Sequence, residues 1–242
     1  GERRILGRRA GKSEVQSVVS RAKKAGINNI SLDVMLGVPG QTKESLKSTL
    51  DFCISSGVPH LSCYILKIEE NTPFFRMRDK LPFPSDDDTA DMYLFMCEYL
   101  EEHGIMQYEI SNFAVPGFES RHNLKYWHDE EYLGIGASAH SFLGGKRTYY
   151  PRDIEYFISG NERLTEGNGG DEEEFCMLAL RLREGLTQER FYARFHHEIP
   201  QKMLESAKQY EKYGLCSCES GGISLTRRGF LLSNSVISEI IL

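Results

Sequence analysis

A strand, a glycine turn, a helix and a second strand follow one another in this chain, and they constrain its fold most. Apolar residues alternate with period two over residues 27–36 and stop at a Gly-Val-Pro-Gly turn at residues 37–40. Thr42 is placed to cap a helix that runs to about residue 54, and a second strand is predicted over residues 60–66. Two strands joined through a helix lie parallel, with a right-handed crossover. The sequence therefore predicts an α/β fold.

The flanking segments continue this pattern. A helix is predicted up to Gly26, with Ser13 and Gln16 in a capping-box arrangement at its start. A further helix is predicted over residues 85–104, where three aspartates complement the positive end of the helix dipole. A short strand over residues 106–110 follows. These strands are too few to close a barrel, so a partial α/β barrel is expected.

Three parts are predicted along the chain. Residues 1–112 form the remainder of an α/β barrel of the TIM type. Over residues 113–170 the periodicity fades and turn signals dominate, which is typical of long functional loops. Residues 171–242 carry three helical patterns, a hairpin signal over residues 215–225 and a last helix after Gly229, which together predict a small, mainly helical, winged-helix-like domain.

Composition excludes several classes of protein. With 242 residues, 40% hydrophobic and 26% charged, the chain has the make-up of an ordinary globular protein. The net charge of -6 argues against a nucleic-acid binder, and no apolar run of membrane-spanning length or secretory leader is visible. A cytoplasmic protein with reduced cysteines is expected. Because the chain opens with Gly1 and enters a helical pattern at once, it is expected to be a piece of something longer.

The segment His122-Asn123-Leu124-Lys125-Tyr126-Trp127 is the first candidate site. Within six residues it offers an imidazole, an amide and two large aromatic faces. Such a set suits a flat, partly apolar ligand that needs an axial nitrogen or a stacking surface. A structural role competes with this interpretation, because a Tyr-Trp pair usually belongs to a core and a lone histidine is usually hydrogen-bonded.

Three further residues are candidates. Asp33 lies near the carboxyl end of a predicted strand, where α/β proteins bind ligands, and could accept hydrogen bonds from a ribose or an amino group; pairing with a neighbouring helix is the alternative. Glu109 could be an acid, a ligand or a strand-end carboxylate bound to nearby backbone N–H groups. His140 lies in a run of small residues where a backbone could approach a planar ligand.

Several of these segments together resemble the oxygen-independent coproporphyrinogen III oxidase-like branch of the radical-SAM proteins, and within it the HemW-like heme chaperones. The resemblance is carried by Leu-Gly-Arg at residues 6–8, by residues 32–42, 107–114 and 132–141, and by the His-Asn-x-x-Tyr-Trp element at residues 122–127. It covers most of residues 5–160 and, more loosely, the tail. Where the family usually has a histidine two residues after the arginine, this chain has Ala10.

The resemblance implies cofactors and site residues. It implies S-adenosylmethionine bound near Arg8 and Asp33, and heme or porphyrin bound at His122, Asn123, Tyr126 and Trp127, with His122 as the ligand of the heme iron. It also implies a [4Fe-4S] cluster on a Cys-x3-Cys-x2-Cys motif. This chain has no such motif, and Cys216-Ser217-Cys218 has the wrong spacing. The cluster cysteines are expected upstream, so the fragment alone is expected to bind no cluster and to be inactive.

Three functions are compatible with these features. The resemblance favours a heme chaperone that passes heme to acceptor proteins. The first alternative is the anaerobic coproporphyrinogen III oxidase, an oxidoreductase that converts two propionates to vinyl groups by 5′-deoxyadenosyl radical chemistry. The second is a non-catalytic module whose helical tail binds a protein partner. An open sheet edge makes self-association an additional expectation.

Overall fold

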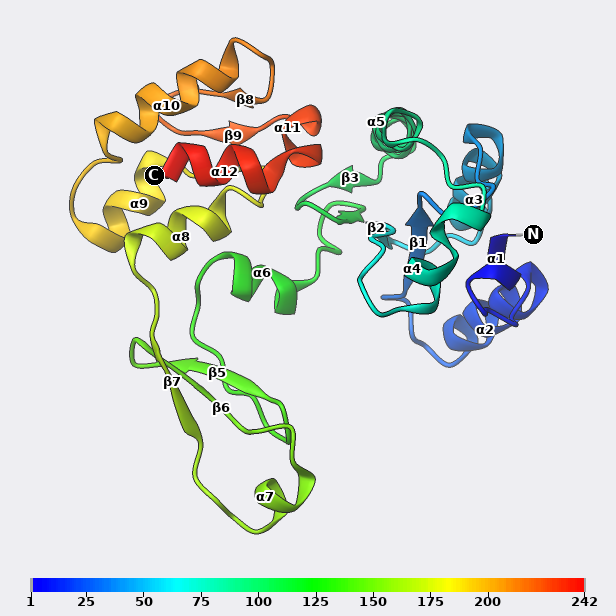
Figure 1. Cartoon of the computed structure of the whole chain (residues 1–242), viewed down its shortest axis with the longest axis horizontal. Helices are drawn as coiled ribbons and strands as arrows, with labels where there is room; N and C mark the ends of the chain where they lie inside the picture. Colours follow the sequence, from blue (N-terminus) through cyan, green and yellow to red (C-terminus); the bar gives the residue numbers. More distant parts are fainter. Residues whose placement is uncertain (1, 242) are drawn as a thin grey trace. The chain divides into compact units, whose positions relative to one another are not determined.

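The computed structural model describes residues 2–241, apart from the side chain of Arg3. The chain divides into two compact units, Gly1–Glu119 (unit 1) and Ser120–Leu242 (unit 2) (Figure 1). The three-part division expected from the sequence stays a prediction. No helix in the described part of the chain has the length and apolar character needed to cross a membrane.

Unit 1 is built on a four-stranded sheet. Its elements are α1 (Glu2–Ile5), α2 (Lys12–Lys24), β1 (Ser31–Leu36), α3 (Lys43–Ser55), β2 (His60–Ile65), α4 (Pro73–Met77), the 3-10 helix η1 (Arg78–Lys80), α5 (Asp86–Glu102), β3 (Met106–Gln107) and β4 (Asn112–Ala114). The strand order is β1-β2-β4-β3. β1 and β2 are parallel, with Ser31 opposite His60 and Leu36 opposite Ile65, which confirms the predicted βαβ unit.

The end of unit 1 differs from the prediction. A single strand was expected over residues 106–110, but β3 stops at Gln107 and pairs antiparallel with β4. The intervening residues form a tight turn, in which the Tyr108 N–H donates to the Asn112 carbonyl and the Ser111 N–H donates to the Glu109 carboxylate. The turn reverses the chain before the strand can lengthen.

Two helices supply the core of unit 1. On α3, Leu46 and Leu50 are fully buried. On α5, Met96 and Leu100 are likewise buried, and Phe113 of β4 is 0% exposed between the two neighbouring strands. Amphipathic helices that bury such a stripe against a sheet obtain most of their stability from this packing.

Helix caps were predicted with mixed success. Thr42 caps α3 as expected, and Ser85 caps α5, each accepting a backbone N–H three residues on. The capping box of α2 is different: the helix begins at Lys12, and the Glu14 carboxylate accepts the Gly11 N–H at 2.8 Å. A carboxylate binds this amide more strongly than the neutral side chain of Gln16 would, so the predicted start was wrong.

Unit 2 contains a small sheet and a helical part. Its elements are α6 (Arg121–Trp127), β5 (His140–Leu143), β6 (Lys146–Tyr149), α7 (Ile154–Ile158), β7 (Leu164–Asn168), α8 (Glu172–Ala179), α9 (Gln188–Phe195), α10 (Gln201–Glu211), β8 (Cys216–Ser217), β9 (Ser224–Leu225), α11 (Arg227–Leu231) and α12 (Ser233–Ile241). The first three of its strands form an antiparallel sheet in the order β5-β6-β7 (Figure 1).

This sheet lies where the sequence indicated long loops. The turn at Gly144-Gly145 joins β5 to β6, but none of the three strands alternates buried and exposed residues regularly. The period-two signal that reveals a half-buried strand is therefore missing. The expectation of a mostly irregular segment was wrong for this reason.

The helical part follows the prediction closely. The three helices α8, α9 and α10 and the β8–β9 hairpin are present. The last helices begin earlier than expected, because Thr226 accepts the Gly229 N–H and starts α11 at Arg227. The fold class is therefore confirmed as α/β, with a small, mainly helical carboxyl-terminal part.

A close approach at Gly229 generates a test of this packing. A Cβ at Gly229 would lie 1.9 Å from the carbonyl oxygen of Leu215, whereas a Cβ at Gly167 of β7 would meet nothing within 4 Å. We expect Gly229→Ala to lower the free energy of unfolding of unit 2 by about 2 kcal/mol or more, and Gly167→Ala to change it by about 0.5 kcal/mol or less. The fluorescence of Trp127, the only tryptophan, followed in urea reports on unit 2. Equal effects of the two substitutions would contradict the close contact.

Candidate functional site

The His-Asn-x-x-Tyr-Trp element forms helix α6. Ser120 caps this helix, its hydroxyl accepting the Asn123 N–H at 3.4 Å. Helical spacing places His122 and Tyr126 on one face. Their ring centroids lie 5.0 Å apart in an edge-on arrangement, and Nε2 of His122 lies 3.4 Å from the Tyr126 hydroxyl. His122 is exposed, so its imidazole is accessible to a ligand.

Trp127 lies on a different part of α6 and is partly buried. The guanidinium of Arg181 lies 5.9 Å from its ring, in a cation–π contact. The structure therefore brings His122 and Tyr126 together directly. Trp127 instead contacts Arg181, which follows α8, and Asn123 donates its backbone N–H to the helix cap.

A row of contacts connects α6 to the sheet of unit 2. The ring of Tyr126 meets Tyr132 edge-on at 4.5 Å. The Tyr132 hydroxyl accepts a hydrogen bond from Arg147 of β6 at 3.3 Å, and its backbone pairs with Phe142 of β5 in both directions. These contacts hold Tyr126, and with it the ring against which His122 packs.

Asp129 is the buried centre of this region, and sequence reasoning missed it. The residue is 4% exposed and adopts a left-handed backbone, with φ of 53°. Its carboxylate accepts from Arg147 at 3.5 Å and from Arg194 of α9 at 3.4 Å. Arg147 also pairs with Glu174 of α8 at 2.6 Å. The four side chains, called here the Asp129 cluster, join the sheet to two helices.

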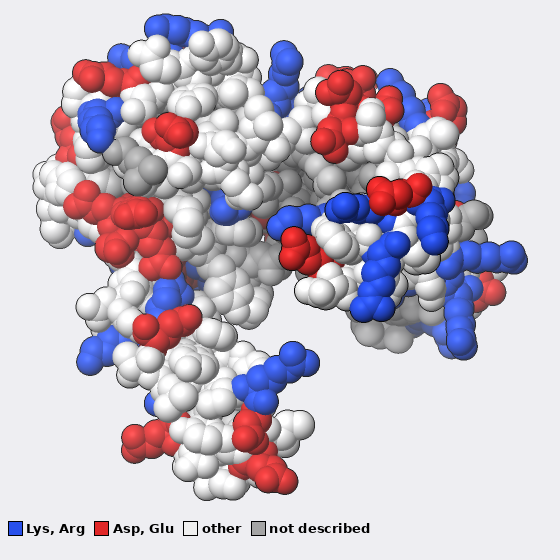
Figure 2. Space-filling view, viewed as in Figure 1, with Lys and Arg blue, Asp and Glu red and all other residues white. Residues whose placement is uncertain are grey.

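The electrostatics of this cluster are finely balanced. Burial raises the pKa of Asp129 to about 6, and the nearby charge of Glu174 adds to the rise, while Arg194 and Arg147 oppose it. The arginines do not reverse the shift because Arg147 lies closer to Glu174 than to Asp129. Figure 2 shows acidic side chains gathered over the start of α8, where Asp171, Glu172 and Glu173 are exposed.

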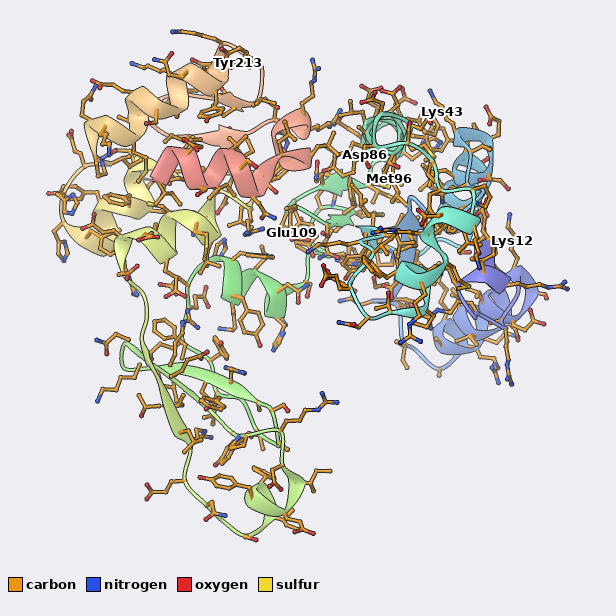
Figure 3. All side chains as sticks on the ribbon, in the orientation of Figure 1. Lys12, Lys43, Asp86, Met96, Glu109 and Tyr213 are labelled. Carbon is orange, nitrogen blue, oxygen red and sulfur yellow. The ribbon has the colours of Figure 1, made fainter. Side chains whose placement is uncertain are left out.

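Unit 1 contains a separate cleft of about 680 Å³ beside the edge strand β1. Asp33 and Leu32 of β1, Phe52 of α3 and Lys12 of α2 are among its lining residues. Lys12 reaches α3 (Figure 3), where its ammonium group donates to the Ser48 hydroxyl at 3.0 Å. A carboxylate beside an apolar wall suits the ribose and adenine of an adenosyl ligand, so this cleft fits S-adenosylmethionine chemically.

Arg8 is exposed between α1 and α2 and is not among the described residues that line this cleft. The structure thus places Asp33 at a cavity and Arg8 outside its wall. Lys12 and Phe52, which sequence reasoning did not single out, line it instead. Neither residue lies in a recognisable motif, and the helix-to-helix contact between α2 and α3 that brings them together is not visible in local spacing.

The cysteines of this chain do not fit an iron–sulfur cluster. Five of the six thiols are buried, and all six are free. Burial raises the pKa of Cys53 to about 11 and that of Cys176 to about 12, which disfavours the thiolate that iron requires. Within residues 2–241, no group of three or more His, Cys, Asp or Glu side chains is arranged to hold a metal ion.

His60 and Glu109 have structural partners in unit 1. His60 of β2 is buried; Nδ1 lies 2.7 Å from the Ser31 hydroxyl and Nε2 lies 2.8 Å from the Tyr108 hydroxyl. Burial lowers the pKa of His60, although Asp33 and Glu119 act in the opposite direction. Glu109 is 1% exposed and accepts a backbone N–H, as the structural alternative for this residue predicted.

Comparison with known proteins identifies relatives along the chain. The HemN C-terminal domain family matches residues 172–232. Heme chaperone HemW of Bacillus subtilis (strain 168) is 34% identical, over 98% of this chain and 65% of that protein. HemW of Lactococcus lactis subsp. lactis (strain IL1403) is also 34% identical, with the same coverage. The chain thus spans somewhat less than two thirds of the length of these curated relatives.

One solved structure shows the same fold. Coproporphyrinogen III oxidase (HemN) from Escherichia coli, described as a radical SAM enzyme, superimposes with a TM-score of 0.76. The match covers 98% of this chain and 60% of that chain, at 18% sequence identity. At this identity the likeness establishes the fold.

The Asp129 cluster generates a pH-dependent test. Because the pKa of the folded state, about 6, lies above the ordinary value of 3.8, Asp129 favours folding most when it is protonated. This contribution is fully present below the ordinary pKa and is lost as pH rises through about 6, and it corresponds to about 3 kcal/mol. We expect the free energy of unfolding of the wild type, minus that of Asp129→Asn, to fall by about 2–3 kcal/mol between about pH 4 and pH 7.

Urea unfolding of both proteins across this range, followed through Trp127, measures the difference. Asn keeps the shape of the side chain and removes its titration, so effects of other groups cancel. A difference that stays constant, or that rises with pH, would mean that the two arginines hold the carboxylate ionised and that its pKa is not raised.

Proposed function

We propose that the chain belongs to the coproporphyrinogen III oxidase-like radical-SAM family and is part of a heme-binding chaperone that passes heme to acceptor proteins, and its similarity to HemW heme chaperones supports this proposal. The observation that carries the proposal is the accessible imidazole of His122 on α6, packed against the ring of Tyr126. Heme or porphyrin is the cargo in this proposal.

His122 can ligate heme iron without disturbing the core. Its Nε2 has one weak partner, the Tyr126 hydroxyl at 3.4 Å, which is near the limit of a hydrogen bond. The Tyr126 ring is held from behind by Tyr132, so it keeps its place when that hydrogen bond breaks. An exposed ligand on a fixed aromatic support suits a cargo that must also be released. Asn123 and Trp127 flank it on the same helix, and we include both in the proposed porphyrin site.

S-adenosylmethionine and a [4Fe-4S] cluster are proposed for the whole protein. The cluster would need thiolates that this chain does not provide. The cleft beside β1 would take the adenosyl ligand, with Asp33 accepting hydrogen bonds from its ribose or amino group, and we retain Arg8 as a second contact only in the whole protein. When bound, these groups supply the radical chemistry of the family.

Anaerobic coproporphyrinogen III oxidase remains the second candidate, and the fold shared with HemN favours it. The HemW relatives, at higher identity, favour the chaperone. We also propose a cytoplasmic location, since six free thiols suit a reducing compartment. Self-association through the edge of β1 is a further proposal, because unpaired backbone groups at a sheet edge can pair with a second copy.

The proposed iron ligand can be tested by titrating this chain with hemin and following the Soret absorbance. We expect His122→Ala to weaken hemin binding about tenfold or more, because an axial nitrogen is lost. The matched variant Tyr126→Phe keeps the aromatic support and frees Nε2, so its affinity should equal or exceed that of the wild type. Unchanged binding by His122→Ala would remove this histidine from the site.

The proposed adenosyl site can be tested by equilibrium dialysis with labelled S-adenosylmethionine. We expect Asp33→Asn to weaken binding about tenfold or more, since a hydrogen bond to a charged group contributes about 1.5–3 kcal/mol. Asp79→Asn is the control, because this carboxylate is 91% exposed on η1, away from the lining of the cleft. Equal affinities of Asp33→Asn and the wild type would contradict the assignment.

A further inference from the structure

A second histidine of unit 2 faces a hollow that the proposed site does not use. The hollow, of about 500 Å³, lies on the β5-β6-β7 sheet, and its lining includes His140, Tyr149, Tyr150, Arg152 and Glu166. This volume is within the range of small-molecule sites in proteins. The wall combines an imidazole, two aromatic rings, a cation and a carboxylate.

The ring of His140 is held on two sides. Tyr149 is its partner across the β5–β6 pair, and the two rings are stacked with centroids 5.4 Å apart and planes 19° apart. On the other side, Nδ1 of His140 lies 3.1 Å from the carboxylate of Glu166 on β7. Three neighbouring strands thus contribute one side chain each, and together they fix the plane of the imidazole.

The hydrogen bond to Glu166 also fixes the tautomer. An ionised carboxylate can only accept, so Nδ1 of His140 carries the proton and Nε2 of the neutral ring keeps its lone pair. Nε2 has no hydrogen-bond partner among the described residues. An imidazole oriented by a carboxylate, with its second nitrogen open, is the usual arrangement of a metal-ligating histidine.

Two other histidines, His197 and His60, lack that open nitrogen. His197 donates through both nitrogens, to the Glu172 carboxylate at 2.9 Å and to the Glu198 carbonyl at 2.9 Å. His60 is engaged at both nitrogens as well. His140 therefore combines an oriented ring, a free lone pair and an adjoining hollow.

The surroundings indicate a planar ligand with anionic groups. Tyr149 and Tyr150 offer aromatic surface, and Arg152 is exposed at the hollow. An iron porphyrin matches this chemistry, because its metal would take the imidazole nitrogen, a carboxylate would pair with Arg152, and Tyr150 would add aromatic surface.

The hollow also shares a face of the sheet with the contacts of α6. Residues two apart on a strand lie on the same face, so Phe142 and His140 point to one side of β5. Tyr132, which supports Tyr126, pairs with Phe142. Strand β5 thus carries His140 and also pairs through its backbone with Tyr132, which supports Tyr126.

We propose that Nε2 of His140, oriented by Glu166, is a second ligand for heme iron on this chain, in addition to His122. The inference rests on the proposed heme-carrier function and extends it by a second point of attachment. A heme held by two exposed histidines can dissociate from one of them while the other still binds the iron.

Hemin titrations of the full 242-residue chain test this proposal. We expect His140→Ala to weaken hemin binding about tenfold or more, and Glu166→Gln to weaken it by up to about tenfold through loss of ring orientation. In the His122→Ala background, the remaining hemin binding should show a histidine-ligated Soret band that His140→Ala abolishes. Metal-free protoporphyrin IX has no iron to ligate, so its affinity should change by about twofold or less. His197→Ala is the control, as an exposed carboxylate-paired histidine without an open nitrogen.

The outcomes separate this inference from the proposed function. Hemin affinity lost in His122→Ala but unchanged in His140→Ala would overturn the inference and leave the heme-carrier function standing. Parallel losses of hemin and protoporphyrin IX in His140→Ala, with an unchanged circular dichroism spectrum, would show that His140 packs against the ring without ligating iron, and would also overturn it. No saturable hemin binding by the wild type would overturn both.

Discussion

The buried carboxylate of Asp129 is the interaction on which unit 2 depends. It is 1% exposed as a side chain, and the groups within reach come from β6, α8 and α9, elements that nothing local would bring together. Removing one partner from such a cluster leaves an uncompensated buried charge, which costs about 3–5 kcal/mol. Packing around the cluster is also tight at Gly170, where a Cβ would lie 2.6 Å from Arg194 and 2.8 Å from Phe142. The Asp129 cluster therefore fixes the positions of β6, α8 and α9 relative to one another.

The Asp129 cluster also determines the position of helix α6. Asp129 follows α6 almost directly, and Arg147, its partner on β6, holds the Tyr132 hydroxyl. Tyr132 supports Tyr126, which in turn packs against His122. Each contact is weak by itself, but every member is fixed by a neighbour closer to the core. The buried charges of the Asp129 cluster thus position the exposed imidazole of His122 through this row of contacts, so the ring is accessible and still has a defined orientation.

Local patterns predicted the elements whose causes are local. Thr42 caps α3, and period-two alternation marks β1, because both depend on residues within one turn or one strand. The β5-β6-β7 sheet and the Asp129 cluster could not be predicted in this way. Arg194 lies 65 positions from Asp129, and the strands between them bury their residues irregularly. The candidate motif at His122 was visible from its composition, whereas the support behind it depends on long-range contacts that no window of sequence contains.

The state of the second ring nitrogen separates His60 and His197 from the two proposed iron ligands, His122 and His140. His60 and His197 use both nitrogens for protein contacts, so binding a metal would cost each of them a hydrogen bond. His122 and His140 have, respectively, a weak partner and one well-aligned partner, and both are exposed. The residue type alone does not separate these four histidines, because the difference lies in their hydrogen-bond partners. A carrier that must surrender its cargo needs ligands of the second kind, because an imidazole sealed in a core would bind slowly and release slowly. In the proposed carrier, His122 on α6 and His140 on β5 meet this requirement, since both are exposed and packed against a tyrosine ring.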